Sequence, residues 1–244
     1  MSNLEGAEVA IVAIGRSFSD FVLSRINSYK YDEIWGINSV GAVFHVDRTF
    51  MMDPASRFLD GDMAGNQTGL GREFLLETPN KGPIYSCCLD ERVPEIDNYP
   101  LEEVVNSLGF AYFNNTVAYA VAFAIMKKVS KIYLYGVDFS YKENVHIAES
   151  GRGCVEFLCA TAISRGIDIQ VAPRSPLLDA NVPENEKLYG YHRLDDPLIQ
   201  RIVDNQLVIT RSSELSVPEP VDERQSVLIG KEDIEGITYE GKDD

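Results

Sequence analysis

Asp138, Ser140 and Tyr141 directly follow a run of strand-forming residues, "KIYLYG", which ends at Gly136. A carboxylate and two hydroxyl groups at the end of one strand can bind a polar ligand or exchange a proton with it. In open α/β sheets, ligands bind outside the carboxyl ends of the strands, so the residues after each predicted strand are the candidates for a site. These candidates are Gly15, Arg16 and Ser17; Asn38 and Ser39; Asp53; Asp138, Ser140 and Tyr141; and Arg174 and Ser175. Such groups are typical of a nucleotide-binding site.

The loop "GRSFSD", which follows the first predicted strand, could bind phosphate. It is neither the dinucleotide fingerprint GxGxxG nor a P-loop. Gly15 would let the backbone come close to an anion, and Ser17 and the following helix amides would donate hydrogen bonds to it. The alternative is a plain turn with a helix cap, and the same alternative applies to Asn115 and Thr116 before a later helix.

Two patterns raise the question of a metal site. "LDGDM", from Leu59 to Met63, contains the DxD pattern with which many glycosyltransferases hold a divalent metal, although a hard cation needs several converging oxygens and a solvated loop is the alternative. The four cysteines, Cys87, Cys88, Cys154 and Cys159, form no CxxC pair, so we expect neither a disulfide framework nor a zinc site. We interpret Cys87 and Cys88 as core residues.

The chain has three histidines, His45, His146 and His192. Histidine is the commonest general acid or base near neutral pH, but spacing alone does not choose among these three.

Strand-like and helix-like segments alternate along the chain. The predicted strands are "EVAIVAIG", "EIWGIN", "RTFMMDP", "PIYSCC", "KIYLYG" and "IDIQVA", and the main helices are "FSDFVLSRINSYK", "NNTVAYAVAFAIMKKV" and "GRGCVEFLCATAISRG". This alternation predicts an α/β fold: a Rossmann-like, mostly parallel sheet with helices on both faces, forming a single nucleotide-binding domain. We expect that domain to span residues 1–211, with an aromatic loop and a helix between Glu186 and Ile209.

The composition limits the partners. The 244 residues are 45% apolar, enough for a full core, and the formal net charge of −16 disfavours binding to nucleic acid or anionic lipid. Residues 212–244 hold 10 acidic and 3 basic side chains and two prolines, which predicts a flexible acidic tail. We expect a cytoplasmic protein with no membrane segment, because the start is acidic and its apolar run is short. Whether the chain forms a homo-oligomer is left open.

The segments "NNTVAYAVAFAIMKKVSKIYLYGVDFSY" and "CVEFLCATAISRGIDIQVAPRSPLL" resemble a superfamily of bacterial sialyltransferases, motility accessory factors and 6-hydroxymethylpterin diphosphokinases. The resemblance runs from Val9 to Leu178 and includes "GRSFSD", Asn38, "GVDF" and "PRSPLL". It implies that His146, ten residues before Glu156 of "EFL", is the general base. Compact relatives of this kind look like phage-encoded proteins, which would place the chain in the host cytoplasm.

This chain also departs from the sialyltransferase pattern. Only "SYKEN" and Val145 separate the "GVDF" strand from His146, where the family has a long lid, and Tyr141 comes one residue later than the family tyrosine. Arg16 replaces a glycine of the first loop, and an arginine there suits a diphosphate.

The resemblance implies a glycosyltransferase that uses a nucleotide sugar as donor and a small-molecule or glycan acceptor, without a covalent intermediate. His146 would deprotonate the acceptor, and Tyr141, Arg16 and Arg174 would stabilise the departing phosphate. One alternative is an ATP-dependent diphosphokinase of a small hydroxymethyl substrate, which needs Mg²⁺ held by Asp53, Asp60, Asp62 or Asp138. The other is a non-catalytic nucleotide-binding or structural protein of phage type.

Overall fold

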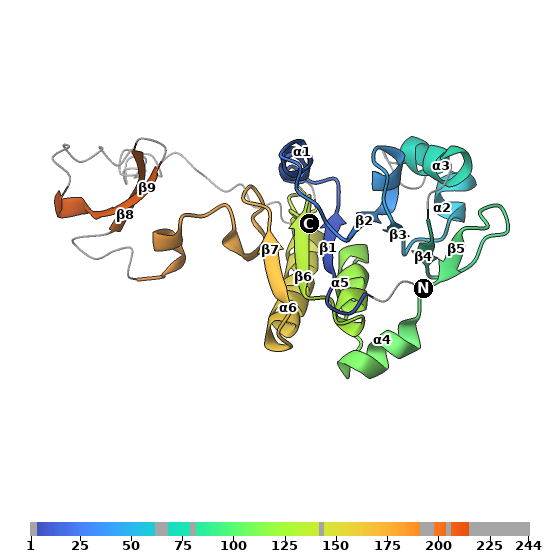
Figure 1. Cartoon of the computed structure of the whole chain (residues 1–244). Coiled ribbons are helices and arrows are strands. Elements are labelled where there is room, and N and C mark those ends of the chain that lie inside the picture. The colour runs from blue at the N-terminus through green and yellow to red at the C-terminus, as the bar shows by residue number, and fades with distance from the viewer. Residues whose placement is uncertain are drawn as a thin grey trace, which may run out of the picture. The chain divides into compact units, whose positions relative to one another are not determined.

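The structure is a computed structural model that describes residues 4–61, 68–78, 82–141, 144–190, 198–203 and 206–214 (Figure 1). The chain divides into two compact units, Met1–Pro183 and Glu184–Asp244, and each is described by itself.

The first unit is built on one seven-stranded sheet in which every neighbouring pair of strands is parallel. Its order is β5-β4-β3-β2-β1-β6-β7. The strands are β1 (Glu8–Val12), β2 (Glu33–Ile37), β3 (Arg48–Phe50), β4 (Ile84–Ser86), β5 (Ile96–Asn98), β6 (Lys131–Tyr135) and β7 (Asp168–Val171). The chain builds outward from β1 through β5, then returns to the other side of β1 as β6 and β7, so the order reverses between β1 and β6. The predicted parallel α/β sheet is confirmed, with a switch point between these two strands.

Helices cover both faces of the sheet (Figure 1). One face carries α1 (Phe18–Ile26), the short α2 (Ser56–Leu59) and α3 (Thr68–Glu77); the other carries α4 (Leu101–Leu108), α5 (Thr116–Met126) and α6 (Val145–Ser164). The side chains of β1 alternate between the two layers, as a strand requires. Val9 and Ile11 belong to the larger core with α5 and α6, whereas Ala10 and Val12 belong to a core with Phe21 of α1.

Helix α5 is the central helix of the larger core. Eight of its 11 residues are buried, and four of these are alanines, which let the helix lie close to the sheet. Phe123 packs its ring against Trp35 of β2 and Phe50 of β3. The prediction that this helix is buried on most sides is confirmed, and its burial fixes the position of its first turn relative to the strand ends.

The second unit contains an antiparallel hairpin of β8 (Leu198–Val203) and β9 (Gln206–Arg211). The helix predicted in this region is therefore wrong. "LIQRIV" and "QLVITR" are rich in β-branched residues, which favour strands. Most of the predicted tail, residues 215–244, lies outside the described residues. Among the helices that the structure describes, none is long and apolar enough to cross a membrane.

Candidate functional site at the switch point of the sheet

A cavity of about 560 Å³ lies where β1, β2 and β6 end and α5 begins. It brings together eight residues that the sequence singled out: Gly15, Arg16, Asn38, Asn115, Thr116, Asp138, Ser140 and Tyr141. Ends of parallel strands meet at one edge of a sheet, which is why positions so far apart in sequence converge here. A smaller pocket of about 330 Å³ adjoins it and shares Arg16, Phe139, Ser140 and Tyr141.

Asp138 joins the end of β6 to the loop after β1. Asp138 is 5% exposed, and its two side-chain oxygens accept hydrogen bonds from the Ser17 amide (2.8 Å) and the Ser17 hydroxyl (2.5 Å). The Ser17 hydroxyl in turn accepts a hydrogen bond from the Gly136 amide at 2.9 Å. Ser17 is fully buried and does not line the cavity, so it contacts Asp138 where the sequence suggested an anionic ligand.

Two glycines allow this close approach. A Cβ on Gly15 would lie 2.5 Å from the Gly136 carbonyl oxygen and 2.6 Å from an oxygen of Asp138. Gly136 has a φ of +66°, and a Cβ there would lie 1.9 Å from the Ala13 carbonyl oxygen. The absence of a side chain at Gly15 therefore accommodates Asp138.

Asn38 lies at the end of β2 with a φ of +54°, in the left-handed region that only a few non-glycine residues adopt. Asn38 lines the cavity, and its side-chain oxygen is buried and has no hydrogen-bond partner among the described residues. A buried polar atom without a partner costs about 1–3 kcal/mol. This carboxamide is therefore available to a ligand in the cavity.

The first turn of α5 opens into the same cavity. Asn115 caps the helix by accepting a hydrogen bond from the Ala118 amide at 3.0 Å, and its side-chain nitrogen donates to the Gly151 carbonyl of α6. Thr116 and Val117 also line the cavity, and their amides have no acceptor among the described residues. The amide groups and the helix dipole make this end of α5 favourable for an anion.

Arg16 and Tyr141 lie at the rim that both pockets share. Both side chains are exposed, and within the described part of the chain no acidic group pairs with Arg16. A guanidinium that no carboxylate neutralises is free to bind an anionic ligand.

The segment that carries Asp138 and Tyr141 is held against α6 by Phe139. Phe139 has a φ of +48°, and its ring lies over Gly151, where an added Cβ would lie 2.7 Å from the ring. Gly151 therefore sets the distance between this segment and α6.

Helix α6 begins at Val145, six residues before the predicted start at Gly151, and its first turns line one side of the smaller pocket. Val145, Ala148, Glu149 and Arg152 face it, at the spacing of one helix side. Glu149 and Arg152 were not predicted as site residues, because the glycines of "GRG" suggested a helix start. Arg152 is paired with Glu156 and Asp179, whereas Glu149 has no partner in the described residues.

The structure places His146 in the first turn of α6, exposed and outside the lining of both pockets. At 3.6 residues per turn it is rotated by about 100° from Val145. His192 lies outside the described residues.

Four other predicted site residues line neither pocket. Arg174 donates to Ser19 and lies 3.5 Å from Asp20 of α1. Ser175 donates to the Val137 carbonyl, Ser39 is buried in the turn after β2, and Asp53 pairs with Arg57.

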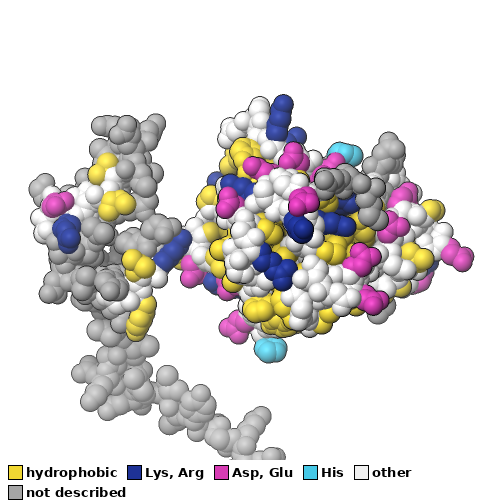
Figure 2. Space-filling view, turned by 60° about the horizontal axis from the view of Figure 1, so that its bottom comes forward, with side chains coloured by type: hydrophobic (Ala, Val, Ile, Leu, Met, Phe, Trp, Pro, Cys, Tyr) yellow, Lys and Arg dark blue, Asp and Glu magenta, His cyan; other side chains and the backbone are white. Residues whose placement is uncertain are grey.

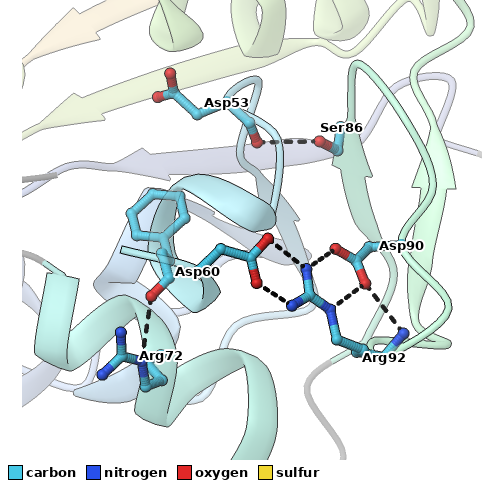
Figure 3. A network of polar contacts seen from close by, with 7 residues as sticks. Asp53, Asp60, Arg72, Ser86, Asp90 and Arg92 are labelled. Atoms are coloured by element: carbon cyan, nitrogen blue, oxygen red, sulfur yellow. Dashed lines mark hydrogen bonds and ion pairs between the residues drawn. The ribbon is translucent and has the colours of Figure 1, made fainter. Parts of the chain in front are cut away.

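Asp60, the first acid of the DxD pattern, is bound by Arg92, whose guanidinium also binds Asp90 (Figure 3). The side-chain hydrogen bond from Arg92 holds the pKa of Asp90 at about 2, below its ordinary value of 3.8. Asp62 lies outside the described residues. No described group of three or more His, Cys, Asp or Glu side chains is arranged to hold a metal ion.

On the face of the molecule seen in Figure 2, the described basic and acidic side chains are interspersed and form no broad basic patch.

No protein-family model matches the sequence, and no curated protein matches it. Among solved structures, the sialyltransferase CstII from Campylobacter jejuni in complex with a substrate analogue, CMP-3FNeuAc, is similar, with a TM-score of 0.44 and 19% identity over 70% of this chain and 82% of that chain. An alpha-2,3-sialyltransferase from Campylobacter jejuni in apo form has a TM-score of 0.36 and 18% identity over 72% of this chain and 81% of that chain.

Proposed function

We propose that the chain is a glycosyltransferase that uses a nucleotide sugar as donor. One observation carries this proposal: at the switch point of a parallel sheet, a single cavity combines an anion-binding helix end, an arginine without an acidic partner and a buried carboxamide without a partner. These three features suit the phosphate and the base of a nucleotide sugar.

The phosphate groups of the donor would bind between Arg16 and the first turn of α5. The amides of Thr116 and Val117 supply directed hydrogen bonds, and Arg16 adds a full positive charge at the rim. Two separate sources of positive potential suit a nucleoside diphosphate better than a monophosphate.

Asn38 would contact the nucleobase or ribose. Its buried oxygen can accept a hydrogen bond from an amino or hydroxyl group, which would relieve the cost of leaving it without a partner. The left-handed backbone at Asn38 holds the carboxamide in place, as is common for residues in binding sites.

The acceptor would enter the smaller pocket. Its apolar wall of Phe139, Val145 and Ala148 and its free carboxylate, Glu149, suit a hydroxyl-bearing ring such as a sugar. The acceptor hydroxyl attacks the anomeric carbon, the bond from that carbon to the donor phosphate breaks, and the phosphate leaves with the electron pair. Arg16 and the hydroxyl of Tyr141, which border both pockets, stabilise the leaving group, and no covalent enzyme intermediate is needed.

The acceptor proton needs a base, and two side chains of α6 are candidates. We keep His146, because a neutral imidazole is suited to this task near pH 7. Glu149 is the alternative that the pocket lining favours, since it faces the smaller pocket and His146 does not. Separate variants of these two residues decide between them.

The diphosphokinase alternative is less well supported. It needs Mg²⁺ held by converging acidic oxygens, but Asp138 is bound to Ser17, Asp60 to Arg92 and Asp53 to Arg57. The described acidic residues that were candidates for holding Mg²⁺ are therefore already bound to other side chains or to the backbone. This favours glycosyl transfer over the diphosphokinase.

A thermal-shift screen against CMP, UDP, GDP, ADP and ATP, each with and without Mg²⁺, tests the proposal. A ligand at 100 times its dissociation constant stabilises a protein by about 2.7 kcal/mol, which a melting curve detects. A pyrimidine or guanine nucleotide that stabilises the chain without Mg²⁺ is the expected result. Stabilisation by ATP alone, and only with Mg²⁺, would favour the diphosphokinase. No response to any nucleotide would favour the hypothesis of a non-catalytic protein.

A further inference from the structure

Asn114 and Asn115, which directly precede α5, bind this helix to α6, which lies beside it on the same face of the sheet (Figure 1). The side-chain nitrogen of Asn114 donates to the Ser150 carbonyl at 3.0 Å and to the Ser150 hydroxyl at 2.9 Å. The side-chain nitrogen of Asn115 donates to the side-chain oxygen of Asn114 at 2.8 Å and to the Gly151 carbonyl at 3.3 Å. All four N–H groups of the two carboxamides are thus used, and we call this set of contacts the asparagine bridge.

The asparagine bridge runs from the larger cavity to the smaller pocket. Asn115 lines the cavity and caps the first turn of α5, whose amides form the proposed phosphate site. The turn of α6 that accepts the hydrogen bonds is flanked by Glu149 and Arg152, which line the smaller pocket. Asn114 lines neither pocket, so any effect it has on a ligand must act through the residues it holds.

A thiol joins the same segment to α6 one turn further along. Cys154 is buried and donates to the Tyr112 carbonyl at 3.3 Å. Burial raises the pKa of this thiol, so it keeps its proton and remains a donor at neutral pH. Cys159 is also buried, but Cys87 and Cys88 are exposed, so the expectation that the adjacent pair belongs to the core is wrong.

The first turns of α6 bury little surface of their own. Asn144, at the N-cap, makes no side-chain cap hydrogen bond, and of residues 145–150 only Ala148 is buried. A helix end with few buried contacts opens at a low free-energy cost. Apart from the packing of Phe139 on Gly151, the asparagine bridge is therefore the main restraint on this end of α6 among the described residues.

We propose that Asn114 is a positioning residue for the acceptor, through which a donor bound at α5 orders the first turns of α6. This inference rests on the proposed function. A phosphate bound by the amides of Thr116 and Val117 would fix the start of α5, and the asparagine bridge would fix the adjoining turn of α6 with it. Because coupling between two binding sites is reciprocal, an acceptor bound against α6 would strengthen donor binding by the same factor.

Hydrogen–deuterium exchange of the full-length protein measures the restraint without any ligand. In Asn114→Ala the amides of residues 149–155 should exchange roughly 2- to 12-fold faster, as expected for loss of a hydrogen bond. Exchange in β1 and β6 should stay as in the wild type, which shows that the fold is intact. Asn106→Ala is the matched control, because Asn106 is an exposed asparagine of α4 with no side-chain hydrogen bond among the described residues. Unchanged exchange in Asn114→Ala, or an equal effect in Asn106→Ala, would overturn the proposal.

UDP, GDP and CMP, added separately, test the coupling. A nucleotide that binds the wild type should slow the exchange of the same α6 amides. Asn114→Ala should bind that nucleotide with similar affinity by calorimetric titration but lose most of this slowing. Full slowing in Asn114→Ala would overturn the coupling and leave Asn114 a purely structural residue. Binding of none of the three to the wild type would contradict the proposed function, on which the coupling rests, while the exchange without ligand would still decide whether Asn114 holds α6.

Discussion

Asp138 and Ser17 are 121 residues apart, yet the carboxylate of Asp138 accepts hydrogen bonds from both the amide and the hydroxyl of Ser17. The carboxylate takes the place at the start of α1 that an anionic ligand would otherwise occupy. Asp138 therefore holds the loop after β1 against the end of β6, and we predict that it acts as a positioning residue of the cavity.

Replacing Asp138 by Asn should destabilise the fold by about 1–3 kcal/mol, because an amide nitrogen would face the Ser17 donors in a buried place. Urea denaturation of Asp138→Asn and Ser17→Ala measures the effect, and the two changes should not be additive, since they remove the same contact. If Asp138→Asn kept full stability and lost only nucleotide binding, Asp138 would be a ligand contact instead.

Two glycines of α6 provide a matched pair of variants. Gly151→Ala forces its Cβ to within 2.7 Å of the Phe139 ring, so the segment that carries Asp138 and Tyr141 must move. We expect a loss of about 1–3 kcal/mol in stability and weaker nucleotide binding. Gly153→Ala meets nothing within 4 Å and should stabilise the helix by up to about 1 kcal/mol. Calorimetric melts of both variants check these opposite signs; equal effects would show that Phe139 is not constrained by Gly151.

The pair of Asp90 and Arg92 should contribute to stability in a defined pH range. Arg92 lowers the pKa of Asp90 from 3.8 to about 2, so the contribution is complete above pH 3.8 and is lost as the pH falls towards 2. The difference in melting temperature between the wild type and Asp90→Asn should therefore shrink over this range. A difference that stays constant from pH 5 to pH 2 would contradict the interaction.

The sequence predicted which residues follow the strands, but it did not predict the side-chain contacts that these residues make. Alternation of strands and helices placed Gly15, Asn38 and Asp138 at one edge, because parallel strands require it. Whether a residue at this edge lines the cavity depends on contacts with residues that are distant in sequence. Ser17 is hydrogen-bonded to Asp138, and Arg174 forms an ion pair with Asp20.

The predicted start of α6 was wrong because of two glycines. Gly151 and Gly153 suggested a helix start, but the helix runs through both, and Gly151 is needed there because the Phe139 ring packs on it. Because α6 begins at Val145 and not at Gly151, Glu149 belongs to the helix and lines the smaller pocket. A helix is predicted where the second unit contains a hairpin, although the β-branched residues of this segment favour strands.

The identity of the catalytic base follows from two variants assayed with whichever donor the nucleotide screen identifies. Removal of the true base should lower kcat by about 10²–10⁴-fold and leave nucleotide affinity unchanged, because the base contacts the acceptor. His146→Ala is expected to show this loss and Glu149→Gln a small effect. The reverse result would assign the base to Glu149, and two unaffected variants would exclude both.

Calorimetric titration of the stabilising nucleotide into three proteins tests whether the cavity binds the donor phosphates through Arg16. These are the wild type, Arg16→Ala and Arg174→Ala. Arg174 is the matched control, because it is an exposed arginine near the same sheet edge that pairs with Asp20 and does not line the cavity. Loss of one charge-assisted contact worth about 1.5–3 kcal/mol should weaken binding by roughly 10- to 150-fold in Arg16→Ala and leave Arg174→Ala like the wild type. Unchanged affinity in Arg16→Ala, with or without a loss in Arg174→Ala, would contradict the account.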